Sequence, residues 1–286
     1  MSYTEQALVI HCHGDSLAGI ASVPDAPRDS AVIIVVGGPQ YRAGSHRQFV
    51  LLARSLAEAG YPALRFDARG MGDSSGDARD FESITDDIGC ALAAFNQALP
   101  AVRRFVLWGL CDGASAALLY VERTQDPRVA GLCLANPWVR SEASLARTQV
   151  KHYYTQRVLQ RDFWLKLLSG RVGVDALRGL ARSVSRSLRA APAARGDDRP
   201  FQHRMATAWQ HFAGALLLVL SADDYTAKEF LEFVSVDAAW QGSLARQGLT
   251  RRDITDADHT FSDPPSRRCA EAVLLNWLRD SWGDAR

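Results

Sequence analysis

The segment around Cys111 constrains the fold more than any other part of the chain. An apolar run at 105–108 leads into Gly109-Leu110-Cys111-Asp112-Gly113, and the helix-forming residues 114–119 follow directly. A strand, a sharp Gly-x-Cys-x-Gly turn and a helix hold the central side chain at the tip of the turn, in a strained backbone conformation. Side chains at the two glycine positions would collide with the strand or the helix. The pattern predicts that Cys111 is a nucleophile presented at the top of a sheet.

Length and composition point to one globular domain. The chain has 286 residues, of which 47% are hydrophobic and 23% charged. This length is close to the upper limit for a single hydrophobic core, so one domain over 1–286 with a large insertion is expected. The longest apolar runs, such as 213–220, are too short to span a bilayer. The first residues lack the basic and apolar stretches of a secretory signal, so we expect a cytoplasmic location.

The other cysteines are expected to be packing residues. The five cysteines are an odd number, widely spread and without paired metal-ligand spacing; besides Cys111 they are Cys12, Cys90, Cys133 and Cys269. The spacing therefore favours neither a disulfide framework nor a zinc site. Free cysteine behaves as a small apolar side chain when buried. We expect no metal ion and no cofactor.

The distribution of elements is typical of a mostly parallel sheet with crossover helices, because short apolar runs alternate with longer amphipathic stretches. The expected strands are 6–13, 17–23, 31–36, 62–67, 103–108, 129–135, 213–221 and 252–255. The expected helices are 47–59, 83–99, the one after Cys111, a helical region at 227–247, and 265–282.

Residues 138–205 interrupt this alternation. They read as amphipathic helix broken by glycines and a proline, which indicates a helical lid inserted into the domain. The segment holds 14 Lys and Arg against 5 Asp and Glu, a net charge of +9, so the rest of the chain carries −8. A basic insertion on an acidic body suggests an anionic partner, although arginine-rich helices also arise simply as solvated surfaces.

Two later segments supply the partners that a thiol nucleophile needs. His259 follows the last short strand, where it would accept the Cys111 proton or form a thiolate–imidazolium pair. A carboxylate that orients the histidine ring is expected just after the strand 213–221. Asp224 is favoured for this role by its distance past the last apolar residue of the strand, with Asp223 in reserve. Asp258 has little weight, since its side chain points away from the useful face of the neighbouring ring.

Acyl transfer also requires two backbone N–H groups aimed at the developing negative oxygen. Asp112, which follows the nucleophile at the start of a helix, supplies one of them. Gly38 is expected to supply the other, because in Val36-Gly37-Gly38-Pro39 the proline has no N–H. His46, close after that loop, and His152, in the expected lid, are candidate substrate contacts.

The core of the chain, 31–136 and 213–282, resembles the α/β-hydrolase superfamily, in which nucleophile, acid and histidine occur in this order. The loop Asp67-Ala68-Arg69-Gly70-Met71-Gly72-Asp73-Ser74 matches the Asp-x-Arg-Gly-x-Gly-x-Ser pattern of that superfamily, while Val36 stands where many members have histidine. The resemblance implies the α/β-hydrolase fold: a mostly parallel central sheet flanked by helices, with a helical lid.

Five longer phrases resemble one branch of this superfamily, the first of the hydrolase families associated with the exosortase A system. They are residues 37–49, 109–116, 136–140, 151–154 and 163–170. This resemblance implies a cytoplasmic hydrolase of Gram-negative bacteria, linked to exopolysaccharide production and to protein-sorting loci. It implies no particular substrate.

The expected activity is hydrolysis of an acyl ester or thioester through an acyl-Cys111 intermediate. Cysteine at this position also resembles dienelactone hydrolases and polyhydroxyalkanoate synthases, which adds an alternative: an acyltransferase that moves an acyl group from a thioester to a glycan hydroxyl. The basic lid would suit coenzyme A phosphates or an anionic lipid-linked glycan. A third alternative is a non-catalytic scaffold that binds a partner through the lid. We expect no nucleic-acid partner and leave the oligomeric state open.

Overall fold

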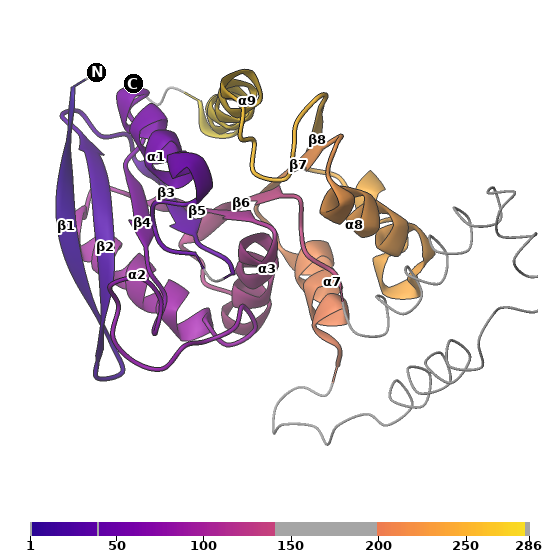
Figure 1. Cartoon of the computed structure of the whole chain (residues 1–286), viewed down its shortest axis with the longest axis horizontal. Helices are drawn as coiled ribbons and strands as arrows, with labels where there is room; N and C mark the ends of the chain where they lie inside the picture. The colour runs from indigo at the N-terminus through magenta and orange to yellow at the C-terminus, as the bar shows by residue number, and fades with distance from the viewer. Residues whose placement is uncertain (1, 39, 141–198, 284–286) are drawn as a thin grey trace, which may run out of the picture. The chain divides into compact units, whose positions relative to one another are not determined.

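The computed structural model describes residues 2–38, 40–140 and 199–283 (Figure 1). The chain divides into a main compact unit, 1–139 with 199–286, and a second unit, 140–198. The main unit has the predicted α/β-hydrolase fold, a mostly parallel sheet with helices on both faces. The expected lid falls largely on 141–198, which lies outside the described residues. No helix in the described part of the chain combines the length and apolar character needed to cross a membrane.

Eight strands form the sheet, in the order β1-β2-β4-β3-β5-β6-β7-β8. The strands are β1 Tyr3–Cys12, β2 Asp15–Pro24, β3 Ser30–Val35, β4 Ala63–Phe66, β5 Arg104–Leu110, β6 Val129–Ala135, β7 Ala215–Ser221 and β8 Leu249–Ile254. The hairpin β1–β2 is antiparallel and joins β4 in antiparallel fashion, whereas all later pairs are parallel. The carboxyl ends of the parallel strands therefore meet at one edge, where ligands of such sheets bind.

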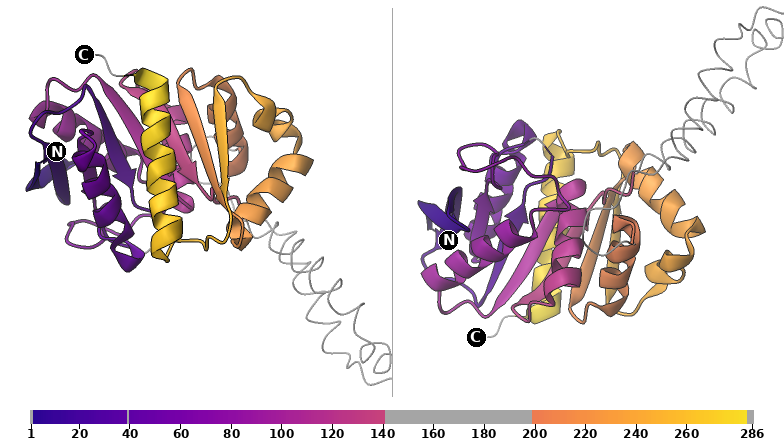
Figure 2. Two further views of the ribbon diagram at one scale, coloured as in Figure 1. Left: turned by 90° about the horizontal axis from the view of Figure 1, so that it is seen from above. Right: turned by 90° about the horizontal axis from the view of Figure 1, so that it is seen from below.

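Helices cover both faces of this sheet. They are α1 Gln48–Glu58, α2 Thr85–Ala98, α3 Asp112–Thr124, α7 Phe201–His211, α8 Tyr225–Val236 and α9 Pro264–Trp282. One apolar cluster joins α1 and α9 to the sheet, and the other joins α2, α3, α7 and α8 to its opposite face. Figure 2 shows α9, in yellow, lying across one face.

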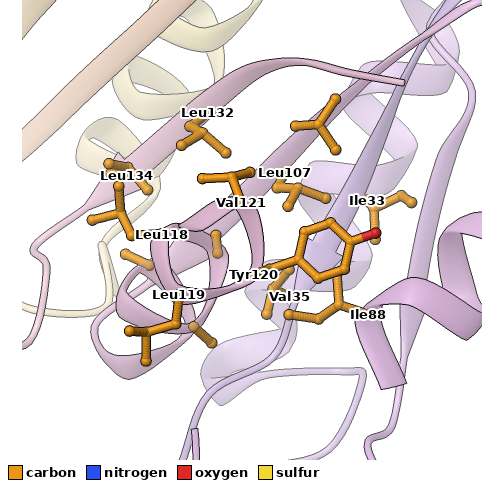
Figure 3. Packing of buried hydrophobic residues seen from close by; sticks show 14 of the residues in the cluster. Ile33, Val35, Ile88, Leu107, Leu118, Leu119, Tyr120, Val121, Leu132 and Leu134 are labelled. Carbon is orange, nitrogen blue, oxygen red and sulfur yellow. The ribbon is translucent and has the colours of Figure 1, made fainter. Parts of the chain in front are cut away.

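The strand β3 explains why the sheet lies between two helix layers. Its residues alternate between the two clusters: Ile33 and Val35 pack toward α2 and α3, and Val32 and Ile34 pack toward α1 and α9. All four are fully buried. A continuous β-branched run is the sequence form of such a strand, because both faces need apolar side chains. Figure 3 shows Ile33 and Val35 facing the helix layer that carries Ile88 and Leu118.

The region 227–247, expected to be helical throughout, contains one helix and two short turns. The helix α8 ends at Val236, and 3-10 turns follow at Ala238–Trp240 and Ser243–Ala245. Asp237 starts the first turn by accepting a hydrogen bond from the backbone N–H of Ala239. This arrangement buries the Trp240 ring against Trp209 of α7, with ring centroids 5.5 Å apart.

The ends of the expected lid segment belong to the core. Val139 is 1% exposed, and Met205 and Trp209 of α7 are fully buried in the cluster that contains α3. The helix α7 begins at Phe201, within the segment 138–205 that the sequence pattern assigned to the lid. Its apolar face resembles that of any amphipathic helix, so its packing partner could not be read from the pattern.

Candidate active site

Cys111 lies in the turn between β5 and α3 with backbone angles of φ 59° and ψ −124°. This conformation is strained for a residue other than glycine. A Cβ at Gly109 would overlap the backbone of Gly113, and one at Gly113 would lie 2.5 Å from the Val35 carbonyl oxygen. The Cys111 N–H donates to the Ala135 carbonyl at 2.9 Å. The turn therefore has the geometry of a nucleophile elbow, with a half-buried thiol at its tip.

Asp224 follows β7 and binds the histidine ring. Its Oδ2 lies 2.8 Å from Nδ1 of His259. Asp224 is also the N-cap of α8, since its carboxylate accepts hydrogen bonds from the backbone N–H groups of Thr226 and Ala227 at 3.0 and 3.2 Å. Asp224 is only 5% exposed, whereas Asp223 is exposed to solvent. The geometry thus favours Asp224 over the reserve candidate.

His259 contacts both of its expected partners. The hydrogen bond with Asp224, and next the hydrogen bond with the Cys111 side chain, raise the pKa of His259 from 6.5 to about 10, although partial burial opposes this rise. The imidazolium form is therefore favoured at neutral pH. Asp258 instead binds Ser262 and Thr260. The structure brings the side chains of Cys111, His259 and Asp224 into contact in the order that the sequence predicts.

The raised pKa of His259 predicts a pH-dependent stability. The pKa in the folded state, about 10, exceeds the ordinary value of 6.5, so the stabilising contribution is fully present below about pH 6.5 and is lost as pH rises through about 10. We expect the difference in free energy of unfolding between the wild type and His259→Gln to shrink over this range, as measured by urea denaturation. Asp224→Asn removes the same ion pair while its side-chain oxygen can still cap α8, so it should show the same trend. A difference independent of pH would contradict this prediction.

The expected oxyanion donors bind a carboxylate of the protein itself. The Gly38 N–H donates to Oδ2 of Asp112 at 2.7 Å. The same carboxylate accepts hydrogen bonds from the backbone N–H groups of Gly113 and Asp112. Burial raises the pKa of Asp112, although these hydrogen bonds and the one from Gly38 act to lower it. Sequence reasoning considered only the backbone N–H of Asp112. In the structure its side chain occupies the place in which a substrate oxyanion is expected.

The loop after β3 is held by the motif at 67–74. Asp67 is fully buried at the end of β4, and its Oδ1 accepts from the Arg42 backbone N–H at 2.6 Å. The Arg42 guanidinium forms ion pairs with both Asp67 and Asp73. The Asp73 N–H also donates to Asp67, at 3.0 Å. This buried carboxylate therefore fixes the loop that carries Gly38.

Asn136 is a positioning residue that sequence reasoning did not single out. It is fully buried after β6, and its Nδ2 donates to Ser221 Oγ at 2.9 Å and to the backbone carbonyl of His259 at 3.2 Å. Its Oδ1 accepts from the Ser221 N–H at 2.8 Å. The amide thus ties the ends of two strands to the histidine loop. The sequence feature that could have indicated Asn136 is its position directly after the apolar strand 129–135.

The two histidines expected to contact substrate are less informative. His46 is exposed. His152 lies outside the described residues.

The fold and the arrangement of the three side chains define the class of protein: an enzyme of the α/β-hydrolase class. Residues 27–215, more than half of the chain, match the family described as serine aminopeptidase, S33. The chain belongs to this family. The match includes the elbow with Cys111 and ends before Asp224 and His259, and the description of the family names serine, whereas this chain has cysteine at the elbow.

Solved structures show the same fold at low sequence identity. An esterase from Pyrococcus furiosus is 16% identical, with 98% of this chain and 92% of that chain covered and a TM-score of 0.65. A putative α/β-hydrolase from Agrobacterium tumefaciens is also 16% identical, with 98% of each chain covered and a TM-score of 0.60. Est1E from Butyrivibrio proteoclasticus, with ferulic acid bound, is 15% identical, with coverages of 96% and 99% and a TM-score of 0.60. No curated protein matches the chain.

Proposed function

We propose that the protein hydrolyses acyl esters or thioesters through an acyl-enzyme formed on Cys111. The observation that carries this proposal is the contact of the Cys111 side chain, at a strained elbow, with a histidine that is paired to a buried aspartate. A nucleophile, a base and an orienting acid in that geometry are the minimum for covalent acyl transfer.

The reaction would proceed in two halves. The Cys111 thiolate attacks the substrate carbonyl carbon, and the negative oxygen that forms is stabilised by backbone N–H groups. The tetrahedral intermediate collapses to acyl-Cys111 while His259 gives its proton to the departing alcohol or thiol. His259, now neutral, then takes a proton from water, which attacks the acyl carbon and releases the acid and the thiolate.

The charge state of His259 supports cysteine as the nucleophile. Its pKa of about 10 favours an imidazolium at neutral pH, and a neighbouring imidazolium stabilises a thiolate. A serine hydroxyl in the same place would need a neutral histidine to remove its proton. Because the Cys111 side chain itself contributes to this raised pKa, the value belongs to the thiol–imidazole pair of this chain and would be lower beside the serine named in the description of the family.

The proposed biological setting rests on the resemblance of the five phrases to the first exosortase-associated hydrolase family. It comprises a cytoplasmic location, a link to exopolysaccharide production and a small-molecule or glycan-linked acyl substrate. The acyltransferase alternative is favoured by the thiol itself, because exchange of an acyl group between two thiols is close to isoenergetic. It differs only in the second half of the reaction, where a sugar hydroxyl replaces water.

The test is detection of the acyl-enzyme by intact mass. Incubation with a panel of acyl thioesters and aryl esters of different chain lengths is expected to add one acyl group, which peptide mapping places on Cys111. The exposed Cys269 is the matched internal control, because a merely reactive surface thiol would be labelled as well. If every acyl donor leaves Cys111 unmodified and none is turned over, the non-catalytic scaffold replaces the proposed hydrolase.

A second stage of this experiment separates hydrolysis from transfer. The acylated protein is transferred to buffer with or without a glycan alcohol, and the free acid and the glycan ester are quantified. Release of the acid at a rate independent of the alcohol supports hydrolysis. Faster loss of the adduct with formation of glycan ester supports the acyltransferase.

A further inference from the structure

Cys12 and Cys90, which are 78 residues apart in sequence, lie against each other away from the elbow. Their Sγ atoms are 2.6 Å apart. This separation is closer to the ~2.05 Å of a disulfide bond than to the spacing of two non-bonded sulfur atoms. Two thiolates on one tetrahedral zinc ion, each ~2.3 Å from the metal, would be separated by about 3.8 Å. The distance between the sulfurs therefore favours a direct bond over a shared metal ion.

Cys12 and Cys90 differ in their burial and in their neighbours. Cys12, the last residue of β1, is 1% exposed, and its Sγ lies 3.7 Å from the Asp86 carbonyl oxygen and 3.8 Å from Asp87 Oδ1. Burial and the neighbouring Cys90 raise the pKa of Cys12 to about 12. Cys90, in α2, is half-buried and more accessible. A ring nitrogen of the exposed His13 lies within 4.8 Å of both sulfurs.

We propose that Cys12 and Cys90 form a reversible disulfide bond that joins the end of β1 to α2. Among the described strands, β1 is at the edge of the sheet and pairs with β2 alone. A covalent link from its last residue to a core helix would fasten this edge hairpin to the rest of the main unit. The bond would also close a long loop, and the entropic stabilisation by a disulfide increases with loop length.

The oxidant that this proposal requires is a small-molecule disulfide such as oxidised glutathione. Cys90, as thiolate, attacks one sulfur of the oxidant, forming a mixed disulfide and releasing one glutathione thiolate. Cys12 then loses its proton and attacks the Cys90 sulfur, which forms the internal bond and releases the second glutathione. Two protein thiols are oxidised, and one external disulfide is reduced to two thiols.

The experiment uses the full chain, treated with oxidised glutathione or with reduced dithiothreitol. Oxidation is expected to remove two hydrogen atoms from the intact mass, to yield a peptide that links Cys12 to Cys90, and to raise the Tm by about 5–10 °C. Dithiothreitol should reverse all three changes. Cys90→Ala should lose them, while the matched control Cys269→Ala, at an exposed cysteine, should keep them.

The peptide map of the wild type keeps the test decisive even if Cys90→Ala folds poorly. A glutathione adduct on Cys90 with no internal bond would overturn the proposal. One equivalent of Zn²⁺ that stays bound through gel filtration, prevents oxidation and is lost in Cys90→Ala would also overturn it, by assigning Cys12, His13 and Cys90 to a metal site.

Discussion

Cys111→Ala is expected to lower kcat for any ester or thioester that the wild type cleaves by about 10⁴-fold or more, because losing the nucleophile of a triad removes the covalent route. The residual rate would come from binding and from the backbone donors alone. The measurement is steady-state hydrolysis by both proteins, with unfolding curves to show that the variant is folded. Cys111→Ala should also bind the substrate with little change in KM, since only transition-state contacts are lost.

Cys111→Ser is the sharper companion to this variant, because it keeps the side-chain shape. The hydroxyl needs a neutral His259 as its base, and the hydrogen bond with Asp224 keeps the pKa of His259 raised even when the contribution of the Cys111 thiol is lost. We therefore expect activity that is weaker than that of the wild type at pH 7 and increases as the pH rises through the raised pKa of His259. Unchanged hydrolysis by Cys111→Ala would place the reaction elsewhere in the protein. A Cys111→Ser variant as active as the wild type at pH 7 would contradict the charged state of the histidine.

The parts of the site that sequence reasoning found are those encoded by short spacings or by chain order. Gly109 and Gly113 identify the elbow, because close packing excludes a Cβ at both positions. Asp224 and His259 were found because the carboxyl ends of β7 and β8 bring the following loops together. In each case a short sequence pattern, together with the known strand order of the fold, is enough to place the residue at the site.

The parts of the site that sequence reasoning missed depend on contacts between segments that are distant in the chain. The Asp112 carboxylate meets a loop 74 residues away, and Asn136 meets Ser221 across 85 residues. The pairing of Cys12 with Cys90 spans 78 residues. Such contacts depend on side-chain rotamers and on how helices are placed on the sheet, neither of which follows from hydrophobic periodicity. The packing of α7 in the core was missed for the same reason, since the apolar face of this helix does not reveal its partner.

Asp112→Ala is expected to raise kcat/KM by about 10-fold, because it empties the oxyanion site. A hydrogen bond to a charged group contributes ~1.5–3 kcal/mol, and ~1.4 kcal/mol corresponds to a factor of ten in rate. In the wild type the substrate carbonyl oxygen must displace the Asp112 carboxylate from the Gly38 N–H before it can be stabilised there. The measurement is hydrolysis of one activated ester by both proteins at the same pH.

Asp112→Asn is the matched control, because it keeps the shape and removes only the charge. Its neutral oxygen holds the same N–H groups more weakly than a carboxylate does, so its kcat/KM should lie between those of the wild type and Asp112→Ala. Protonation of Asp112 has the same effect, and burial raises its pKa, so the advantage of Asp112→Ala should diminish as the pH falls through that pKa. If both substitutions instead lower kcat while KM stays constant, the carboxylate takes part in the transition state. The bond from Gly38 would then hold a catalytic group in place.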